Sequence, residues 1–241
     1  MERRHGLLGI CSGPGRTMMY IVYNDEYAVA FDITDIKILM HALEINPPAM
    51  FMEMMDVFKC RKMFKRKLLA IFTTQYRQHC DIYRCHYDFL SKSIFFGRNL
   101  KEKRYCFEDF EILVLAIPCC TNDSFSFLID DYLILGSVVS YLGYGKFYKG
   151  TTEKLNYTFK KFSTNVKPHV ICCYGRDFSR AGYRFACEYF EVPTEFRSKK
   201  FLTFGEEQVY NPFFNYKKLM DEGNIESLNT LIHTRNRHKR M

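Results

Sequence analysis

The feature that most constrains the fold is a series of short apolar runs, rich in aromatic and β-branched residues and separated by polar or glycine-containing breaks. Runs of this length and composition are typical of β-strands. Two of them, Thr17–Tyr23 and Tyr27–Phe31, flank the polar turn Asn24–Glu26 and predict a hairpin. The other predicted strands are Ser93–Phe96, Arg104–Phe107, Phe110–Ile117, Phe125–Ile129, Tyr132–Tyr141, Leu155–Phe159 and His169–Tyr174. The opening, through about Arg16, is short and glycine-rich, and Gly9–Thr17 within it is predicted to be a flexible entry turn.

Helical periodicity is confined to a few segments. Asp35–Ile45 predicts a short amphipathic helix, and Ala49–Gln78 predicts the longest one, with an apolar stripe opposite a basic cluster. Further predicted helices are Ser179–Phe190, Lys217–Asp221 and Glu226–His233. Many short strands with few helices favour the α+β class, as an antiparallel β-sandwich decorated with helices. No linker or shift in composition divides the chain, so residues 1–241 are predicted to form a single domain.

Composition and cysteine usage indicate a folded protein of a reducing compartment. With 47% hydrophobic and 17% aromatic residues in 241, the chain has enough apolar surface to exclude disorder as its main state. No apolar run approaches the ~18 residues of a membrane span, and the N-terminal apolar stretch is too short for a signal peptide. We therefore expect the ten cysteines to be free thiols and the protein to be intracellular and cytoplasmic.

No catalytic or metal-binding signature emerges from the residue pattern. The segment Gly9–Thr17 departs from a phosphate-binding loop in its spacing, in an arginine where lysine is required and in the strand that follows it. The cluster His79–His86 lacks the paired spacing of a zinc site. His169 and Cys173 are too far apart along a strand to hydrogen-bond. The sequence thus predicts no catalytic residue and no metal ligand, and it favours a protein without catalytic activity while not excluding an enzyme.

The net charge of +8 favours anionic partners such as nucleotides or nucleic acid. The basic residues gather in two places, Lys59–Lys67 and the tail Arg235–Arg240. A solvated helix face and a solvated terminus explain both clusters, and contact with phosphates is the alternative. In that alternative the contacting residues are Arg61, Lys62, Lys65, Arg66, Arg235, Arg237, Lys239 and Arg240.

The segment Gly175–Arg180 is the best candidate for a phosphate or nucleotide site. It lies between a predicted strand and a predicted helix, where exposed backbone amides favour anions. Asp177 is placed to cap the helix, and Arg176 and Arg180 flank it. A plain strand–helix turn with surface arginines is the other interpretation.

Three stretches together resemble parts of the cypovirus polyhedrins, the proteins of viral occlusion bodies. They are the hairpin Met18–Phe31 with the helix that follows it, the segment Asp130–Leu133, and the predicted helix Asp177–Phe190. The resemblance implies a β-sandwich decorated with helices. It departs from that family at Met1–Arg16, which is short and glycine-rich where the family has a polar helical arm.

The first functional hypothesis is accordingly a viral structural protein that self-assembles into a protective intracellular lattice, the occlusion body. Its partners are further copies of itself, and it needs no cofactor, although its cationic surface suits a bound nucleotide. The alternative hypothesis is a basic nucleic-acid-binding regulatory protein of viral or host origin, for which the nucleus is a second compartment. A nucleotide-directed enzyme that uses Gly175–Arg180 ranks last. None of these involves a membrane.

Overall fold

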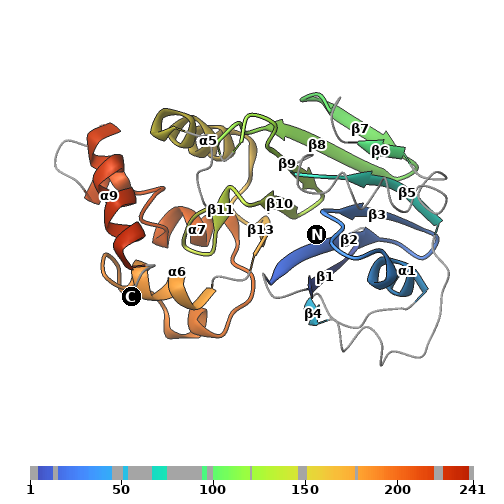
Figure 1. Ribbon diagram of the computed structural model, residues 1–241, viewed down its shortest axis with the longest axis horizontal. Helices are drawn as coiled ribbons and strands as arrows, with labels where there is room; N and C mark the ends of the chain where they lie inside the picture. Colours follow the sequence, from blue (N-terminus) through green and yellow to red (C-terminus); the bar gives the residue numbers. More distant parts are fainter. Residues whose placement is uncertain are drawn as a thin grey trace.

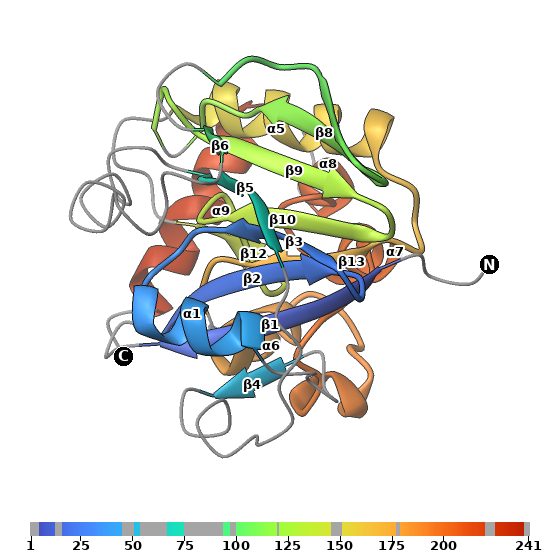
Figure 2. The same cartoon turned by 90° about the vertical axis from the view of Figure 1, so that its right-hand side faces the viewer.

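The computed structural model of the chain describes residues 5–12, 16–44, 51–53, 67–74, 94–96, 100–119, 121–145, 151–176, 179–219 and 225–238. These residues form four layers, shown in Figures 1 and 2. Helix α1 covers the outer face of one sheet, a second sheet packs on the inner face of the first, and a group of helices covers the far face of the second sheet.

The first sheet has six strands in the order β4-β1-β2-β3-β5-β6. The strands β1, β2 and β3 pair antiparallel, whereas β4, β5 and β6 join the sheet by parallel pairing. Helix α1 spans Ile36–Glu44, and Asp35 caps its start by accepting hydrogen bonds from the amides of Lys37 and Ile38. The strand bounds are β1 Gly6–Ser12, β2 Thr17–Tyr23, β3 Tyr27–Phe31, β4 Phe51–Glu53, β5 Lys67–Phe72 and β6 Ile94–Phe96.

The second sheet has five strands in the order β13-β10-β9-β8-β7. Strands β7 to β10 form an antiparallel meander, and β13 pairs parallel with β10. Their bounds are β7 Arg104–Phe107, β8 Phe110–Ala116, β9 Phe125–Ile129, β10 Tyr132–Gly136 and β13 Ile171–Tyr174. A small hairpin of β11 (Val139–Ser140) and β12 (Gly143–Tyr144) follows β10.

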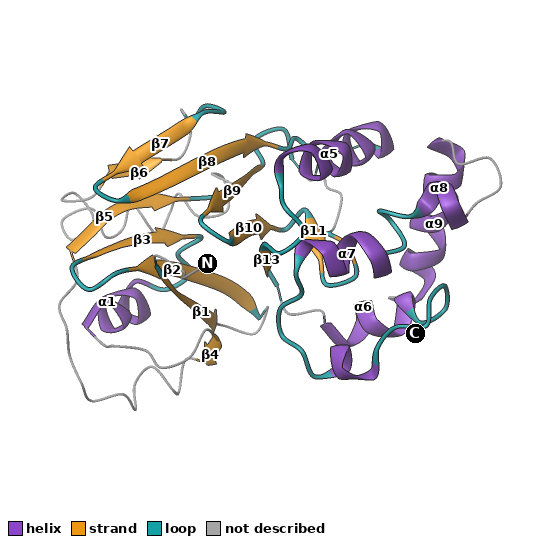
Figure 3. Cartoon of the chain, turned by 180° about the vertical axis from the view of Figure 1, so that it is seen from behind, coloured by secondary structure: helices purple, strands orange, loops and turns teal. Residues whose placement is uncertain are grey.

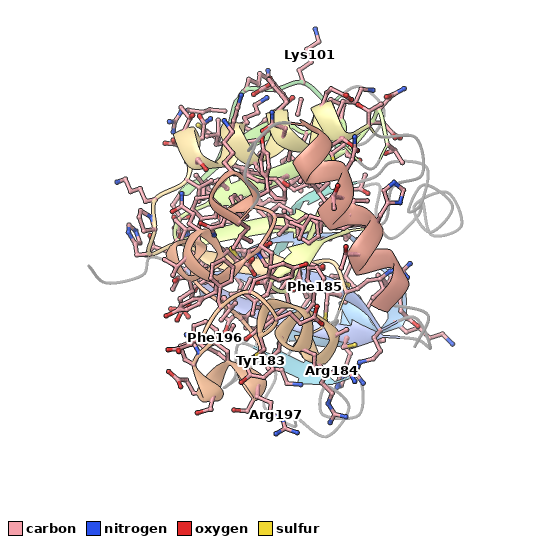
Figure 4. All side chains as sticks on the ribbon, turned by 90° about the vertical axis from the view of Figure 1, so that its left-hand side faces the viewer. Lys101, Tyr183, Arg184, Phe185, Phe196 and Arg197 are labelled. Carbon is pink, nitrogen blue, oxygen red and sulfur yellow. The ribbon has the colours of Figure 1, made fainter. Side chains whose placement is uncertain are left out.

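The helical layer packs on the second sheet, as the view from behind in Figure 3 shows. Its α-helices are α5 Thr152–Asn165, α6 Ser179–Ala186, α7 Phe204–Tyr210, α8 Tyr216–Leu219 and α9 Ile225–His238, and η1 (Thr194–Arg197) is a 3-10 helix. Apolar residues of these helices share one core with the second sheet, and α9 packs on α5 and α8. In Figure 4, Phe185 of α6 lies within this layer, whereas Arg184 and Arg197 lie at its surface.

The strands are apolar on both faces because both faces are covered. In β2, Met18, Tyr20 and Val22 pack between the two sheets, while Met19 and Ile21 pack toward α1. The neighbouring cysteines of β13 behave in the same way, because Cys172 faces the helices and Cys173 faces the other sheet. Strands buried on both sides have near-continuous apolar runs rather than alternating ones.

This architecture corrects the predicted fold class. The antiparallel β-sandwich decorated with helices is wrong, because both sheets are mixed and lie between two helical layers. The parallel pairs cannot be joined by tight turns, and accordingly helix α1 lies between β3 and β5 in the chain, as α5 lies between β10 and β13. The single domain over residues 1–241 stays a prediction.

Three predicted elements are wrong. The helix Ala49–Gln78 instead contains strands β4 and β5, and its residues 49–50, 54–66 and 75–78 lie outside the described part of the chain. The strand Leu155–Phe159 lies within helix α5, where Leu155, Phe159 and Phe162 bury one face. The predicted entry turn Gly9–Thr17 instead contains the end of β1 and the first residue of β2. For the helix and the strand, the apolar spacing fitted two periods, and burial decided between them.

The predicted hairpin Thr17–Tyr23 and Tyr27–Phe31 is confirmed as β2 and β3. Helix α6 is confirmed over Ser179–Ala186, shorter than predicted. Within the described residues, we find no helix with the length and apolar character needed to cross a membrane.

Candidate functional site

The carboxyl ends of strands from both sheets meet at one edge of the molecule. Strand β3 runs parallel to β5, and β10 runs parallel to β13, so these four strands end there together. The sheets are joined at this edge by the amide of Phe125, at the start of β9, which donates to the carbonyl of Thr74 over 2.9 Å. In open α/β sheets the edge beyond the carboxyl ends of strands is the usual place for a ligand. We call the following residues the strand-end junction: Asp32, Thr73, Thr74, Gly136, Gly175 and Arg176.

Asp32 is the acidic residue at the centre of the junction. It follows β3 directly, has φ of 52°, and is 3% exposed. Its Oδ1 accepts from the amide of Thr74 at 2.7 Å and from the hydroxyl of Thr73 at 3.3 Å, and its Oδ2 accepts from the hydroxyl of Thr74 at 2.7 Å. Both carboxylate oxygens are therefore held by groups that follow β5.

Two glycines let the strand ends approach closely. Gly136 ends β10 with φ of 58°, and a Cβ there would collide with the side chain of Thr74. Gly175 follows β13, and a Cβ there would collide with the backbone of Gly136. The amide of Gly175 donates to the carbonyl of Gly136 over 2.7 Å. Glycine is needed at both positions, and the centre of the junction is filled by protein atoms.

The start of β2 closes the junction on one side. The amide of Met18 donates to the carbonyl of Gly175 over 3.1 Å, and Thr17 forms a bridge with Arg176. The half-buried Arg176 thus adds a positive charge to the edge at which the Asp32 carboxylate lies buried.

A buried carboxyl group lies behind the junction, in the layer between the second sheet and the helices. Glu207 of α7 is fully buried and accepts hydrogen bonds from the hydroxyl of Tyr174 (2.6 Å), the amide of Leu142 (2.9 Å) and the side-chain amide of Asn211 (2.7 Å). Burial raises the pKa of Glu207 to about 7, although these three donors act to lower it. Burial also raises the pKa of the nearby Cys172 thiol well above its usual value, so this cysteine stays protonated.

Histidine and acidic residues meet at the opposite edge of the sheets, before strands β1, β8 and β10. The ring of His5 contacts Asp130 at 2.5 Å and Asp109 at 3.0 Å, and its side chain is fully buried. Burial alone lowers the pKa of His5, but the bonds to Asp130 and then Asp109 outweigh it, so the pKa is raised. Because its two nitrogens point to different carboxylates, this cluster joins the first strand to the second sheet rather than forming a ligand site.

The predicted site residues are only partly assembled by the fold. Gly175 and Arg176 lie in the junction as expected for a strand–helix turn, and Arg180 lies in α6. Asp177 lies outside the described residues. Of the predicted nucleic-acid contacts, the backbone of Arg235 and Arg237 belongs to α9, whose side chains are not described there. The remaining ones, Arg61, Lys62, Lys65, Arg66, Lys239 and Arg240, lie outside the described residues.

Sequence reasoning missed Asp32, Thr73 and Thr74. It gave Asp32 no role in a site, and it placed Thr73 and Thr74 in the predicted helix Ala49–Gln78. The available signal was that polar residues directly follow two apolar runs, Tyr27–Phe31 and Leu68–Phe72. That signal becomes visible only when both runs are recognised as parallel strands.

Comparison with known proteins gives a consistent result. No family model matches the chain. The chain is 34% identical over 231 residues to a probable hydroxyacylglutathione hydrolase of Encephalitozoon cuniculi, and the match covers 92% of this chain and 93% of that protein. Among solved structures, it is similar to ETHE1 of Myxococcus xanthus with a TM-score of 0.62 and 14% identity, covering 97% of this chain and 90% of that one. It is also similar to a metallo-β-lactamase of Staphylococcus aureus, with a TM-score of 0.60 and 13% identity, covering 96% of this chain and 67% of that one.

These similarities overturn the earlier hypotheses of identity. The resemblance to cypovirus polyhedrins is wrong, because it rested on about a fifth of the chain, whereas the hydrolase match covers 92%. The occlusion-body protein and the nucleic-acid-binding regulator are wrong for the same reason. Aromatic hairpins and amphipathic helices are local patterns that many folds share, so three such stretches do not identify a family.

The staphylococcal protein is named for a metal ion, which raises the question of whether the strand-end junction fits one. A catalytic zinc site takes three protein ligands from histidine, cysteine and carboxylate side chains. Nowhere in the described ranges do three such residues come together in a way that could hold an ion. Asp32 is the junction's acidic member, and its oxygens are already engaged. The residues described at the junction therefore do not fit a metal ion.

Proposed function

The chain belongs to the hydroxyacylglutathione hydrolase family within the metallo-β-lactamase fold, and from this premise we propose that it hydrolyses the thioester of a hydroxy acid with glutathione. In this reaction water adds to the thioester carbonyl carbon and the carbon–sulfur bond breaks. The products are the free hydroxy acid and glutathione, whose sulfur takes up a proton. The observation that carries the proposal is the 34% identity over nearly the whole of both chains.

The proposed place of binding is the strand-end junction. Support comes from its position beyond the carboxyl ends of β3, β5, β10 and β13, where α/β folds bind ligands. Glutathione carries carboxylates, and Arg176 supplies a cation at this edge that suits them. The paired glycines Gly136 and Gly175 let the two strand ends approach each other closely at this edge.

The test is direct hydrolysis of the glutathione thioester of lactate, a small hydroxy acid. Loss of the thioester is followed by its ultraviolet absorbance, since the protein's own ten cysteines would disturb a thiol reagent. We expect saturable turnover by the native chain and a raised KM in Arg176→Ala. The matched control is Arg184→Ala, which removes an exposed arginine of α6 away from the junction. Turnover that is absent, or equal in both variants, contradicts the proposal.

A second candidate function is binding of the same thioester without hydrolysis. It is favoured by one observation, the lack of a fitting metal donor set among the junction residues that the structure describes. Calorimetric titration with S-methylglutathione, a thioether that cannot be hydrolysed, separates the two candidates. Binding that weakens in Arg176→Ala, together with no turnover of the thioester, would establish the second candidate.

A further inference from the structure

We infer that the strand-end junction of this chain holds no resident divalent metal ion. This inference goes beyond the proposed function and does not depend on which thioester is bound. It concerns the side chains and backbone of the junction. Its first basis is the hydrogen bonding and burial of Asp32. A carboxylate that ligates an ion must direct an oxygen lone pair at it, but Asp32 accepts three hydrogen bonds from Thr73 and Thr74 while 3% exposed. Turning it toward an ion would leave these buried donors without their acceptor.

The second basis is the close contact between the strand ends, which leaves no room for an ion between them. The side chain of Thr74 fills the volume where a Cβ of Gly136 would stand, and the backbone of Gly136 fills the corresponding volume at Gly175. The backbone hydrogen bond between Gly175 and Gly136 fixes this approach at 2.7 Å. The strand ends that would surround an ion are thus in direct contact with one another.

The third basis is the location of the better metal ligands. The described histidines lie elsewhere: His5 and His169 pair with aspartates at the amino ends of strands, His41 belongs to α1, and His233 and His238 belong to α9. Cys172 and Cys173 of β13 are buried, and burial keeps the Cys172 thiol protonated, whereas a metal needs the thiolate.

The fourth basis is the residues that the sequence offers directly after the strands. Gln75, Arg77 and Gln78 come soon after β5, and Arg176 comes after β13. Amides are weak zinc ligands, and an arginine stays protonated and repels a cation. His79 and Cys80 are the first strong donors along the chain after Thr74, so they provide the control.

The experiment measures metal in the native full-length chain. The protein is produced without a histidine tag in cells supplied with zinc, manganese and iron, dialysed without chelator, and analysed by plasma mass spectrometry. Thermal unfolding is recorded with and without a chelator and with added manganese, which thiols bind weakly. We expect metal well below one ion per chain and an unchanged Tm in every condition. The double variant His79→Ala/Cys80→Ala should give the same metal content as the native chain.

A stoichiometric ion whose removal lowers Tm would overturn the inference. So would a rise in Tm on addition of manganese, or a loss of bound metal in the double variant. The outcome is independent of the hydrolysis assay: a metal-free protein that still cleaves the thioester satisfies both proposals. A metal-free protein that neither binds nor cleaves it refutes the proposed function alone.

Discussion

Glu207 accepts a hydrogen bond from the hydroxyl group of Tyr174 over 2.6 Å, in the buried layer between the second sheet and the helices. Tyr174 is the last residue of β13 and directly precedes Gly175 of the strand-end junction. Its carbonyl in turn accepts from the hydroxyl of Tyr20 over 2.7 Å, which links β13 to the first sheet. The strand that ends at the candidate site is therefore held from the helical layer and from the other sheet.

This buried carboxyl group makes stability depend on pH. Burial raises the pKa of Glu207 from 4.5 to about 7, so between these values the folded state binds the proton more tightly than the unfolded state. The stability that the protonated Glu207 contributes is complete below the pKa of this group in the unfolded chain, and it is lost as the pH rises through about 7. Relative to Glu207→Gln, we expect the free energy of unfolding of the native chain to fall by up to about 3 kcal/mol from about pH 5 to about pH 8. Urea denaturation across this range measures the difference.

The control for this prediction is Glu191→Gln, which neutralises an exposed glutamate near the same helices. The free energy of unfolding of this variant should change with pH in the same way as that of the native chain. If the profile of Glu207→Gln were also parallel, Glu207 would not be the titrating group.

His5 is predicted to stabilise the folded state most strongly at acidic and neutral pH. Its pKa is raised, so the stability that it contributes is fully present below the unfolded pKa and is lost as the pH rises through the raised value. Replacing it in His5→Asn removes a buried pair with Asp130 and should cost about 2 kcal/mol near pH 6. The cost should shrink toward about pH 9, as measured by chemical denaturation.

The matched control is His169→Asn. His169 pairs with Asp131 at 3.1 Å, but its side chain is 56% exposed, so solvent screens the interaction. We expect little change in stability at either pH. Equal losses from both histidine variants would show that burial of the His5 pair has no special effect.

Thr74 is predicted to contribute to stability through its hydroxyl group. Thr74→Val keeps the shape of the side chain but removes the 2.7 Å hydrogen bond to Asp32 Oδ2, at a cost of about 1–3 kcal/mol. Thr73→Val removes a longer bond of 3.3 Å to the same carboxylate and should cost less. Thermal unfolding of both variants measures which one loses more stability. The prediction fails if Thr73→Val lowers Tm more than Thr74→Val does.

Gly136 is predicted to tolerate no side chain. Gly136→Ala places a Cβ against Thr74 and forces alanine to adopt φ of 58°, which should cost about 2 kcal/mol or more. The control is Gly205→Ala in helix α7, where the added Cβ lies 3.0 Å from Pro168. The higher helix propensity of alanine offsets this close contact. A comparable loss in both variants, measured by urea denaturation, would mean that neither the positive φ nor the collision matters.

The parts of the fold that were predicted correctly are those decided by neighbouring residues. The hairpin of β2 and β3 follows from two β-forming runs and from Asn24, whose side-chain oxygen accepts from the amides of Glu26 and Tyr27. Helix α1 follows from its apolar spacing and from Asp35 at its start. In both cases the interactions that stabilise the element lie within it or beside it in the sequence.

The errors occurred where burial on both faces removed the local signal. In β5, Phe72 packs between the sheets and Ile71 packs toward α1, so the run has no polar face and fits a helical stripe as well as a strand. In α5 the opposite error arose, because Leu155, Tyr157 and Phe159 alternate although Tyr157 is exposed and Thr158 is buried. Only the neighbouring layers distinguish the two periods.

By itself the sequence determined that this chain folds around a large apolar core and where most of its strands lie. It did not determine the candidate site, because Asp32, Thr74, Gly136 and Gly175 are separated by up to 143 residues along the chain, from 32 to 175. Their proximity depends on parallel pairing between distant strands and on the packing of two sheets. Tertiary structure alone decided which polar residues meet at the strand ends, because the free energy of that arrangement comes from burying both faces of each sheet and not from any local preference of those residues.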